Sequence, residues 1–158
     1  QAADRGSEVH AALESFFETR HVTSKFSDAV LGTEGEVIKI FGDLEWSTEK
    51  SFGHPMGFGG KVDLHSRDGN GVVIDFKTKE FTRDQMEKVQ GFDEHLMQLA
   101  AYRIGLDLPD ARCANVFVSV TEPGLAVVRE WSQEDLNRGR AMFESLLNYW
   151  YAKSGLER

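Results

Sequence analysis

The sequence has few cysteines and no long apolar run. Cys113 is the only cysteine among 158 residues, which excludes an internal disulfide and a cysteine-ligated metal cluster. No apolar stretch approaches the roughly 18 residues of a membrane helix, so we expect no membrane partner. Asp4 and Arg5 precede an amphipathic rather than an apolar segment, so we expect no signal peptide. The predicted location is the cytoplasm, or an organelle matrix if a targeting segment has been removed, and not secretion.

The chain also lacks an excess of basic residues. It carries 18 lysines and arginines against 26 acidic residues, a formal charge of −8. Because phosphate contacts usually require lysine and arginine, this balance argues against a nucleic-acid partner. A site that binds a divalent cation is the exception, because the cation supplies positive charge locally. The length and the 41% hydrophobic content predict one globular domain over residues 1–158.

Hydrophobic periodicity predicts the elements of the fold. A spacing of three and four predicts helices over residues 5–19 and 93–105 and a last helix from residue 132. Thr33 and Glu36, three residues later, form a capping box that predicts a short helix over 33–41. Alternation and β-branched runs predict strands over 44–52, 57–66, 72–79, 113–120 and 125–131. The polar residues 80–92 predict a mobile segment with one helical turn, which could form a flap or arch. This order predicts an α/β domain whose mixed central sheet is flanked by helices.

The predicted hairpin over residues 60–79 carries the most informative polar residues. Its turn, 68–71, reads Asp-Gly-Asn-Gly, so Asp63 on the first strand should lie level with Asp75 on the second. Lys77 is two residues beyond Asp75 and should leave the same face. Two adjacent carboxylates are costly unless neutralised, which favours a Mg²⁺ or Mn²⁺ site over a surface salt bridge.

These residues resemble a known nuclease motif. Asp63 followed by Asp75-Phe-Lys-Thr is similar to the paired motif of the PD-(D/E)XK nuclease superfamily, and more narrowly to its RecB-like branch. His10, four residues after Gly6 on the first helix, and the pair Gln98 and Tyr102 match two further elements of that branch. Alone, His10 would more often be a core histidine, and Gln98 and Tyr102 a structural hydrogen-bonded pair. The layout is most similar to single-domain exonucleases of the mitochondrial genome maintenance exonuclease type and their phage relatives.

The resemblance implies a restriction-endonuclease-like αβββαβ core and a metal-dependent deoxyribonuclease. It implies one or two Mg²⁺ or Mn²⁺ ions, and the single cysteine excludes an iron–sulfur cluster. The implied catalytic residues are Asp63, Asp75, Lys77, Gln98 and Tyr102. The implied metal ligands are His10, Asp63, Asp75 and the main-chain carbonyl of Phe76.

The implied activity is exonucleolytic hydrolysis of DNA, single-stranded or with free ends, in recombination, repair or replication. Candidate contacts to the nucleic-acid backbone are Lys61, Lys79, Arg83, Lys88 and Arg103, and candidate stacking residues are Phe58, Phe81 and Phe92. Three alternatives stay open: an endonuclease of the same fold, an inactive DNA-end binding module, and a structural metal-binding hairpin. Glu14 and Glu49 are weaker candidates near the predicted site, and no protein partner is indicated.

Overall fold

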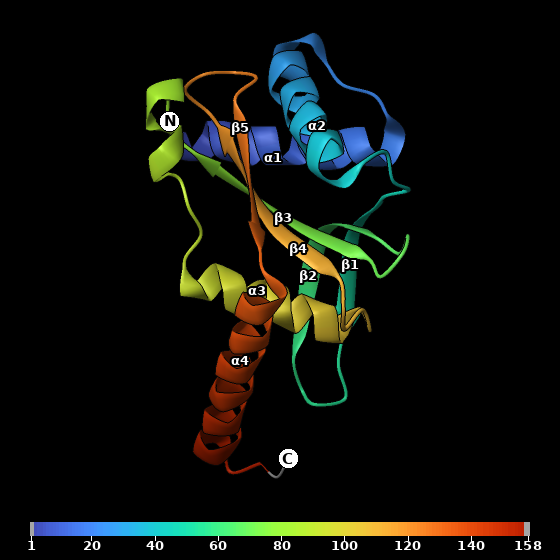
Figure 1. The fold of residues 1–158 in the computed structure, drawn as a ribbon, viewed down its shortest axis with the longest axis vertical. Helices are drawn as coiled ribbons and strands as arrows, with labels where there is room; N and C mark the ends of the chain where they lie inside the picture. The colour runs from blue at the N-terminus through green and yellow to red at the C-terminus, as the bar shows by residue number, and fades with distance from the viewer. Residues whose placement is uncertain (1, 157–158) are drawn as a thin grey trace.

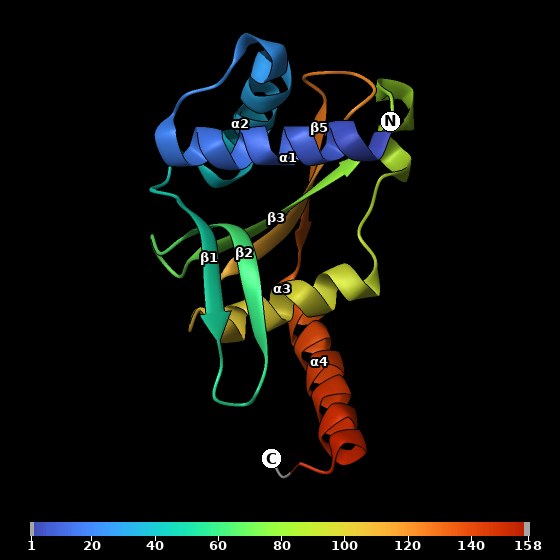
Figure 2. The same cartoon turned by 180° about the vertical axis from the view of Figure 1, so that it is seen from behind.

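A five-stranded mixed sheet separates two helical layers in the computed structural model, which describes residues 2–156. Figures 1 and 2 show α1 and α2 on one side of the sheet, and α3 with the projecting α4 on the other. The helices are α1 (Ala2–Thr19), α2 (Ser27–Phe41), α3 (Asp93–Gly105) and α4 (Gln133–Ser154), with 3-10 turns η1 (Ser24–Phe26) and η2 (Arg83–Lys88). The strands are β1 (Ser47–Gly53), β2 (Gly59–Ser66), β3 (Val72–Lys79), β4 (Arg112–Ser119) and β5 (Ala126–Trp131).

The strands lie in chain order, and only β3 and β4 pair in parallel. The predicted α/β class with a mixed, helix-flanked sheet is therefore confirmed. Residues 72–74 of the central strand are all buried, because helices cover both faces. Leu13 of α1 packs with Ile74 on one face, and Leu96 of α3 packs with Val73 on the other.

One predicted helix boundary is wrong. We expected Thr33 to cap a short helix, but α2 begins at Ser27 and places Thr33 inside it. The Thr33 hydroxyl donates to the carbonyl of Ala29 at 2.7 Å. Ala29, Val30 and Val37 are all buried, so the apolar face begins about one turn before Thr33. Burial of that face, rather than a capping residue, sets where the helix starts.

Strand β2 changes face at Asp63. The pairing of β2 with β3 runs from Ser66 to Leu64, which lies opposite Ile74. In a regular strand, residues two apart share a face. Here Leu64 lies in the core beneath α1, but Val62 lies in the core beneath α3, on the opposite face of the sheet. Opposite Asp63, Glu49 of β1 has a left-handed φ of 47°. The Asp63 carboxylate turns out of the ladder and accepts a hydrogen bond from the Phe76 N–H at 2.9 Å.

The segment between β3 and α3 contains the 3-10 helix η2, which at six residues is longer than the single turn expected. The segment is also anchored to the sheet. The Arg129 guanidinium on β5 donates to the carbonyls of Val89 at 2.7 Å and Met86 at 2.9 Å. The Ser119 hydroxyl donates to the carbonyl of Phe81 at 2.6 Å. Phe81 and Val89 are each 2% exposed. This segment is therefore docked rather than the free flap that its polar sequence predicted, and within residues 2–156 no helix is long and apolar enough to cross a bilayer.

Candidate active site

Asp75 and Lys77 lie side by side on the central strand. Their side chains leave the same face of β3, and the Lys77 Nζ is 3.0 Å from the Asp75 Oδ2. Asp75 is 4% exposed, because α3 covers this face of the sheet. Burial raises the pKa of Asp75 to about 6, although the Lys77 charge opposes that rise. This carboxyl group therefore keeps its proton up to a higher pH than an exposed aspartate does.

Two residues of α3 extend the chain of hydrogen bonds that starts at the Lys77 amine. Lys77 donates to the Gln98 Oε1 at 3.4 Å, and the Gln98 Nε2 donates to the Tyr102 hydroxyl oxygen at 2.8 Å. Gln98 and Tyr102 are four residues apart and so share one helical face. Burial raises the pKa of Tyr102 to about 12, with the nearby Asp75 charge adding to the rise. The phenol therefore stays protonated, and its O–H remains a donor while its oxygen accepts from Gln98.

Asn115 and Trp131 extend this hydrogen-bond network from the Asp75 carboxylate. The sequence analysis did not predict either residue as part of the site. The Asn115 Nδ2 donates to the Asp75 Oδ2 at 3.4 Å, while its Oδ1 accepts from the Trp131 Nε1 at 2.8 Å. Asn115 pairs with Asp75 in the parallel ladder and is fully buried. A lone asparagine within the apolar run 113–118 was the available signal. Its partner could not be found without the strand register.

Helix α1 brings a second cluster to the face change of β2. The His10 Nε2 lies 3.2 Å from the Asp63 Oδ2, and the His10 Nδ1 lies 3.2 Å from the Glu14 Oε1. One ligand atom from each of His10, Glu14 and Asp63 lies within 4.8 Å of the other two. Glu14, which the sequence left open, therefore joins His10 and Asp63. Asp75 does not belong to this three-residue group, although its carboxyl group shares a hydrogen bond with that of Asp63.

Glu49, the other weak candidate, borders the same cluster. It shares a hydrogen bond with Glu14, and the Lys61 Nζ lies 3.6 Å from its Oε1. Burial, reinforced by this hydrogen bond, raises the pKa of Glu14 to about 7. The same hydrogen bond lowers the pKa of the exposed Glu49. The left-handed backbone at Glu49 thus aims a second acid toward α1.

The charges within the cluster oppose one another. A hydrogen bond to Asp63 raises the pKa of His10 above its usual value, against the effect of its partial burial. Burial by itself would raise the pKa of Asp63. The hydrogen bond from His10, the His10 charge and the Phe76 N–H outweigh burial, so the pKa of Asp63 lies below its usual value. The imidazole and the carboxylate therefore favour a shared proton, a position that a cation can also take.

A glycine allows α1 to approach the sheet this closely. A Cβ atom on Gly6 would lie 2.5 Å from the Thr78 Oγ1, closer than any non-bonded contact allows. Gly6 lies one turn before His10. The absence of a side chain there sets the distance from the helix to β3, and with it the position of the imidazole.

The residues predicted to contact a nucleic-acid backbone differ in exposure and in pairing with acids. Lys61 pairs with Glu49, and the Arg83 Nε lies 3.5 Å from the Glu122 Oε2. Lys79 and Lys88 are exposed near the ends of β3 and η2. Among the predicted stacking residues, Phe81 is buried in the core with Val89 and is unsuited to stacking. Phe92 is 57% exposed, and Phe58 lines a hollow beside α4.

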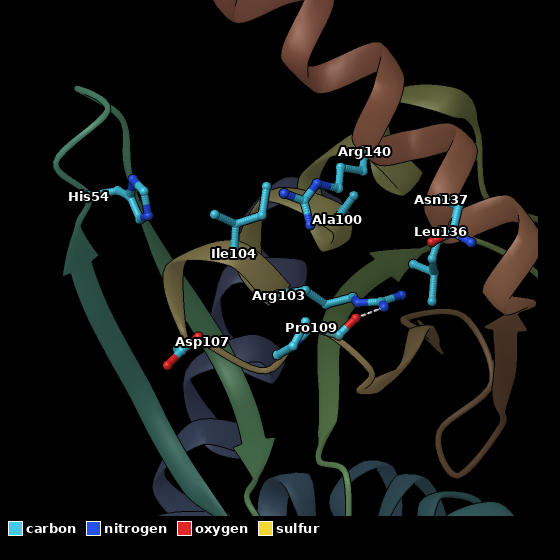
Figure 3. A pocket seen from close by; sticks show the side chains of 9 residues that line it. All are labelled: His54, Ala100, Arg103, Ile104, Asp107, Pro109, Leu136, Asn137 and Arg140. Atoms are coloured by element: carbon cyan, nitrogen blue, oxygen red, sulfur yellow. Dashed lines mark hydrogen bonds between the residues drawn. The ribbon is translucent and has the colours of Figure 1, made fainter.

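Arg103, the fifth predicted contact, is buried against α4. It is 7% exposed, and its guanidinium donates to the carbonyl of Pro109. A hollow of about 200 Å³ lies beside it, with Ile104 and Arg140 among its lining residues (Figure 3). This position is incompatible with the expected surface contact. The cause is the packing of α4 on α3, which no local pattern in α3 reveals.

Comparisons with known proteins support the fold. No family model and no curated protein matches this sequence. A crystal structure from Eubacterium rectale, of a protein named as a candidate exonuclease, is 14% identical; the alignment covers 98% of this chain and 69% of that chain, with a TM-score of 0.52. The structure of SSO0001 is 16% identical, with coverage of 78% and 61% and a TM-score of 0.38, too low for inference. The chain therefore shares its α/β fold with that crystal structure from Eubacterium rectale.

Proposed function

We propose that the protein is a metal-dependent DNA exonuclease that hydrolyses phosphodiester bonds at single-stranded ends. The RecB-like branch of the PD-(D/E)XK superfamily is the family that we propose for it. The observation that carries this proposal is the Lys77 amine, held 3.0 Å from a buried aspartate beside an imidazole and two more carboxylates. Buried titratable groups that shift one another's pKa values are typical of catalytic sites.

The donor atoms suit a divalent cation. His10, Glu14 and Asp63 offer one nitrogen and two oxygens within 4.8 Å of one another. Carboxylate oxygens suit Mg²⁺ and Mn²⁺, and the imidazole favours Mn²⁺. Asp75 and the carbonyl of Phe76 stay in the proposed ligand set. When bound, the cation supplies Lewis acidity and positive charge for attack by water on the phosphate.

The chain's own residues position the substrate and the amine. An ammonium has three N–H donors, of which Asp75 and Gln98 take two. The third N–H of Lys77 would stabilise negative charge that develops on the phosphate. Gln98 orients the amine, and the Tyr102 hydroxyl orients Gln98. The Tyr102 O–H would then donate a hydrogen bond to a neighbouring phosphate oxygen of the strand.

Oligonucleotides labelled at either end, single- or double-stranded, test the proposal in Mg²⁺, Mn²⁺ and EDTA. We expect cleavage of single strands with metal and none in EDTA. Lys77→Met and Asp75→Asn should each lower the rate at least ~100-fold with the fold retained. Lys39→Met is the matched control, because Lys39 lies on α2 with its side chain 70% exposed. Cleavage by Lys77→Met at the wild-type rate would refute the proposed role of the amine.

Two alternatives predict different products from the same assay. An endonuclease would also cut a circular single strand, whereas an exonuclease leaves the circle intact and degrades the linear form. A binding module that had lost activity would retain linear strands without shortening them in either metal. The intact set of Asp63, Asp75 and Lys77 favours an active enzyme.

A further inference from the structure

A continuous hollow runs from the candidate active site along α4. One part, of about 440 Å³, is lined by Gln98 and Tyr102 among others. The next part, of about 520 Å³, extends toward the C-terminal end of α4. Both parts share Phe58, Phe143 and Leu146. We call this surface the aromatic groove and define it by Phe58, Phe143, Leu146, Tyr149 and Trp150.

The groove exposes large apolar side chains together on one helical face. Leu146 is 53% exposed, Tyr149 63% and Trp150 42%. Single exposed apolar residues are ordinary on protein surfaces. Tyr149 and Trp150 lie three and four residues after Leu146 on α4. Together the three side chains form a contiguous apolar patch of the kind that marks a binding surface.

The loop between β1 and β2 supplies the opposite wall. The Phe58 ring meets the Phe143 ring edge to face, with 4.9 Å between centroids, and stacks on His54 at 4.7 Å. These contacts hold Phe58 in place against α4. The groove is therefore bounded by ordered rings at its centre and leaves Tyr149 and Trp150 accessible at its far end.

The cationic surface of this protein is poorly suited to hold a strand by its phosphates alone. The net charge is −8, Lys61 and Arg83 are paired with acids, and Arg103 is buried. Of the five predicted phosphate contacts, this leaves the exposed Lys79 and Lys88. Affinity for nucleic acid that rests on phosphate neutralisation requires free basic groups. Stacking of bases on aromatic rings is the other general source of affinity for single strands, and it does not require net positive charge.

We propose that the aromatic groove binds the unpaired bases of the substrate strand while its backbone reaches Lys77. The inference rests on the proposed function for the identity of the strand and is carried by the continuity of the groove with Gln98 and Tyr102. Bases in a duplex are already stacked and paired, so their faces are unavailable to the groove. Selection for single strands then comes from the groove rather than from a flap over the site.

Binding can be measured separately from cleavage. Fluorescence anisotropy in EDTA would compare a labelled 12-nucleotide DNA strand with an abasic strand of equal length, and both would be repeated in Mg²⁺ on the Lys77→Met background. We expect at least ~10-fold tighter binding of the strand with bases. Trp150→Ala and Tyr149→Ala should each weaken that binding about tenfold. Tyr149→Phe should keep the affinity, because it keeps the ring.

Leu31→Ala is the matched control, because Leu31 is 49% exposed on α2, the helix on the other side of the sheet. Circular dichroism would verify that each variant is folded. Equal affinity for the abasic strand, or wild-type affinity in the Trp150 and Tyr149 variants, would overturn the inference. The inference would also be overturned if the wild-type protein is a dimer and these variants dissociate it without changing DNA binding. The groove would then bind a second copy of the chain rather than bases. Tight, base-dependent binding without cleavage would instead contradict the proposed function and leave the groove supported.

Discussion

Gly6 provides a sharp test of how α1 sets the candidate metal site. A Cβ on Gly6 would lie 2.5 Å from the Thr78 Oγ1 and 3.4 Å from the Thr78 Cβ. Alanine in a helix interior is worth about 0.5–1 kcal/mol more than glycine, whereas overpacking costs about 1–3 kcal/mol. We therefore expect Gly6→Ala to lower the free energy of unfolding by about 0–2.5 kcal/mol.

The matched control is Gly35→Ala on α2, since Gly35 is exposed and a Cβ there meets nothing within 4 Å. It should stabilise the protein by about 0.5–1 kcal/mol, or raise the Tm by a few degrees, roughly 2–4 °C per kcal/mol. Thr78→Ala removes the clashing oxygen, so Gly6→Ala should become stabilising on that background. Urea denaturation of the four variants in the cycle gives the coupling energy.

Metal binding should change in parallel with stability across the same Gly6 and Thr78 variants. If Gly6→Ala displaces α1, calorimetry should show weaker Mn²⁺ binding, because His10 and Glu14 both lie on that helix. The Gly6→Ala, Thr78→Ala double variant should recover affinity. If Gly6→Ala stabilises as much as Gly35→Ala and binds Mn²⁺ like wild type, the close approach of α1 does not control the site.

Three further predictions concern burial and protonation. Burial raises the pKa of the Cys113 thiol to about 12, so Ellman's reagent should leave the native thiol unmodified and react only as urea unfolds the chain. Leu13 is fully buried, and Leu13→Ala should cost about 2–5 kcal/mol in urea denaturation; a smaller loss would mean that α1 is not packed as described. Partial burial, aided by the Lys77 charge, lowers the pKa of His95, whose Nδ1 accepts from the Phe92 N–H at 3.0 Å. Because the unfolded chain binds this proton more readily, stability should fall as the pH drops below about 6.5, and His95→Gln, which keeps an acceptor, should show a shallower fall; equal slopes would refute this.

Local spacing was sufficient for part of the site. A period of two places Asp75 and Lys77 on one face of a strand, and a period of four places Gln98 and Tyr102 on one face of a helix. The symmetric hairpin about residue 69 likewise predicts that Asp63 lies level with Asp75, and the pairing of the neighbouring Leu64 with Ile74 fits this register. These relations depend only on backbone geometry within one element or across one turn. The order of elements and the mixed sheet follow from the same periodicities.

The remaining features depend on packing between distant elements. Glu14 joins His10 and Asp63 only because Gly6 lets α1 lie against β3, and Asn115 reaches Asp75 only through the parallel register of β4. Arg103 is a surface residue by local pattern and a buried one because α4 covers α3. The sequence alone determined which residues can share a face, because backbone periodicity is local. The tertiary structure decided which faces meet and which rings stay exposed, because burial depends on contacts between elements far apart in the chain.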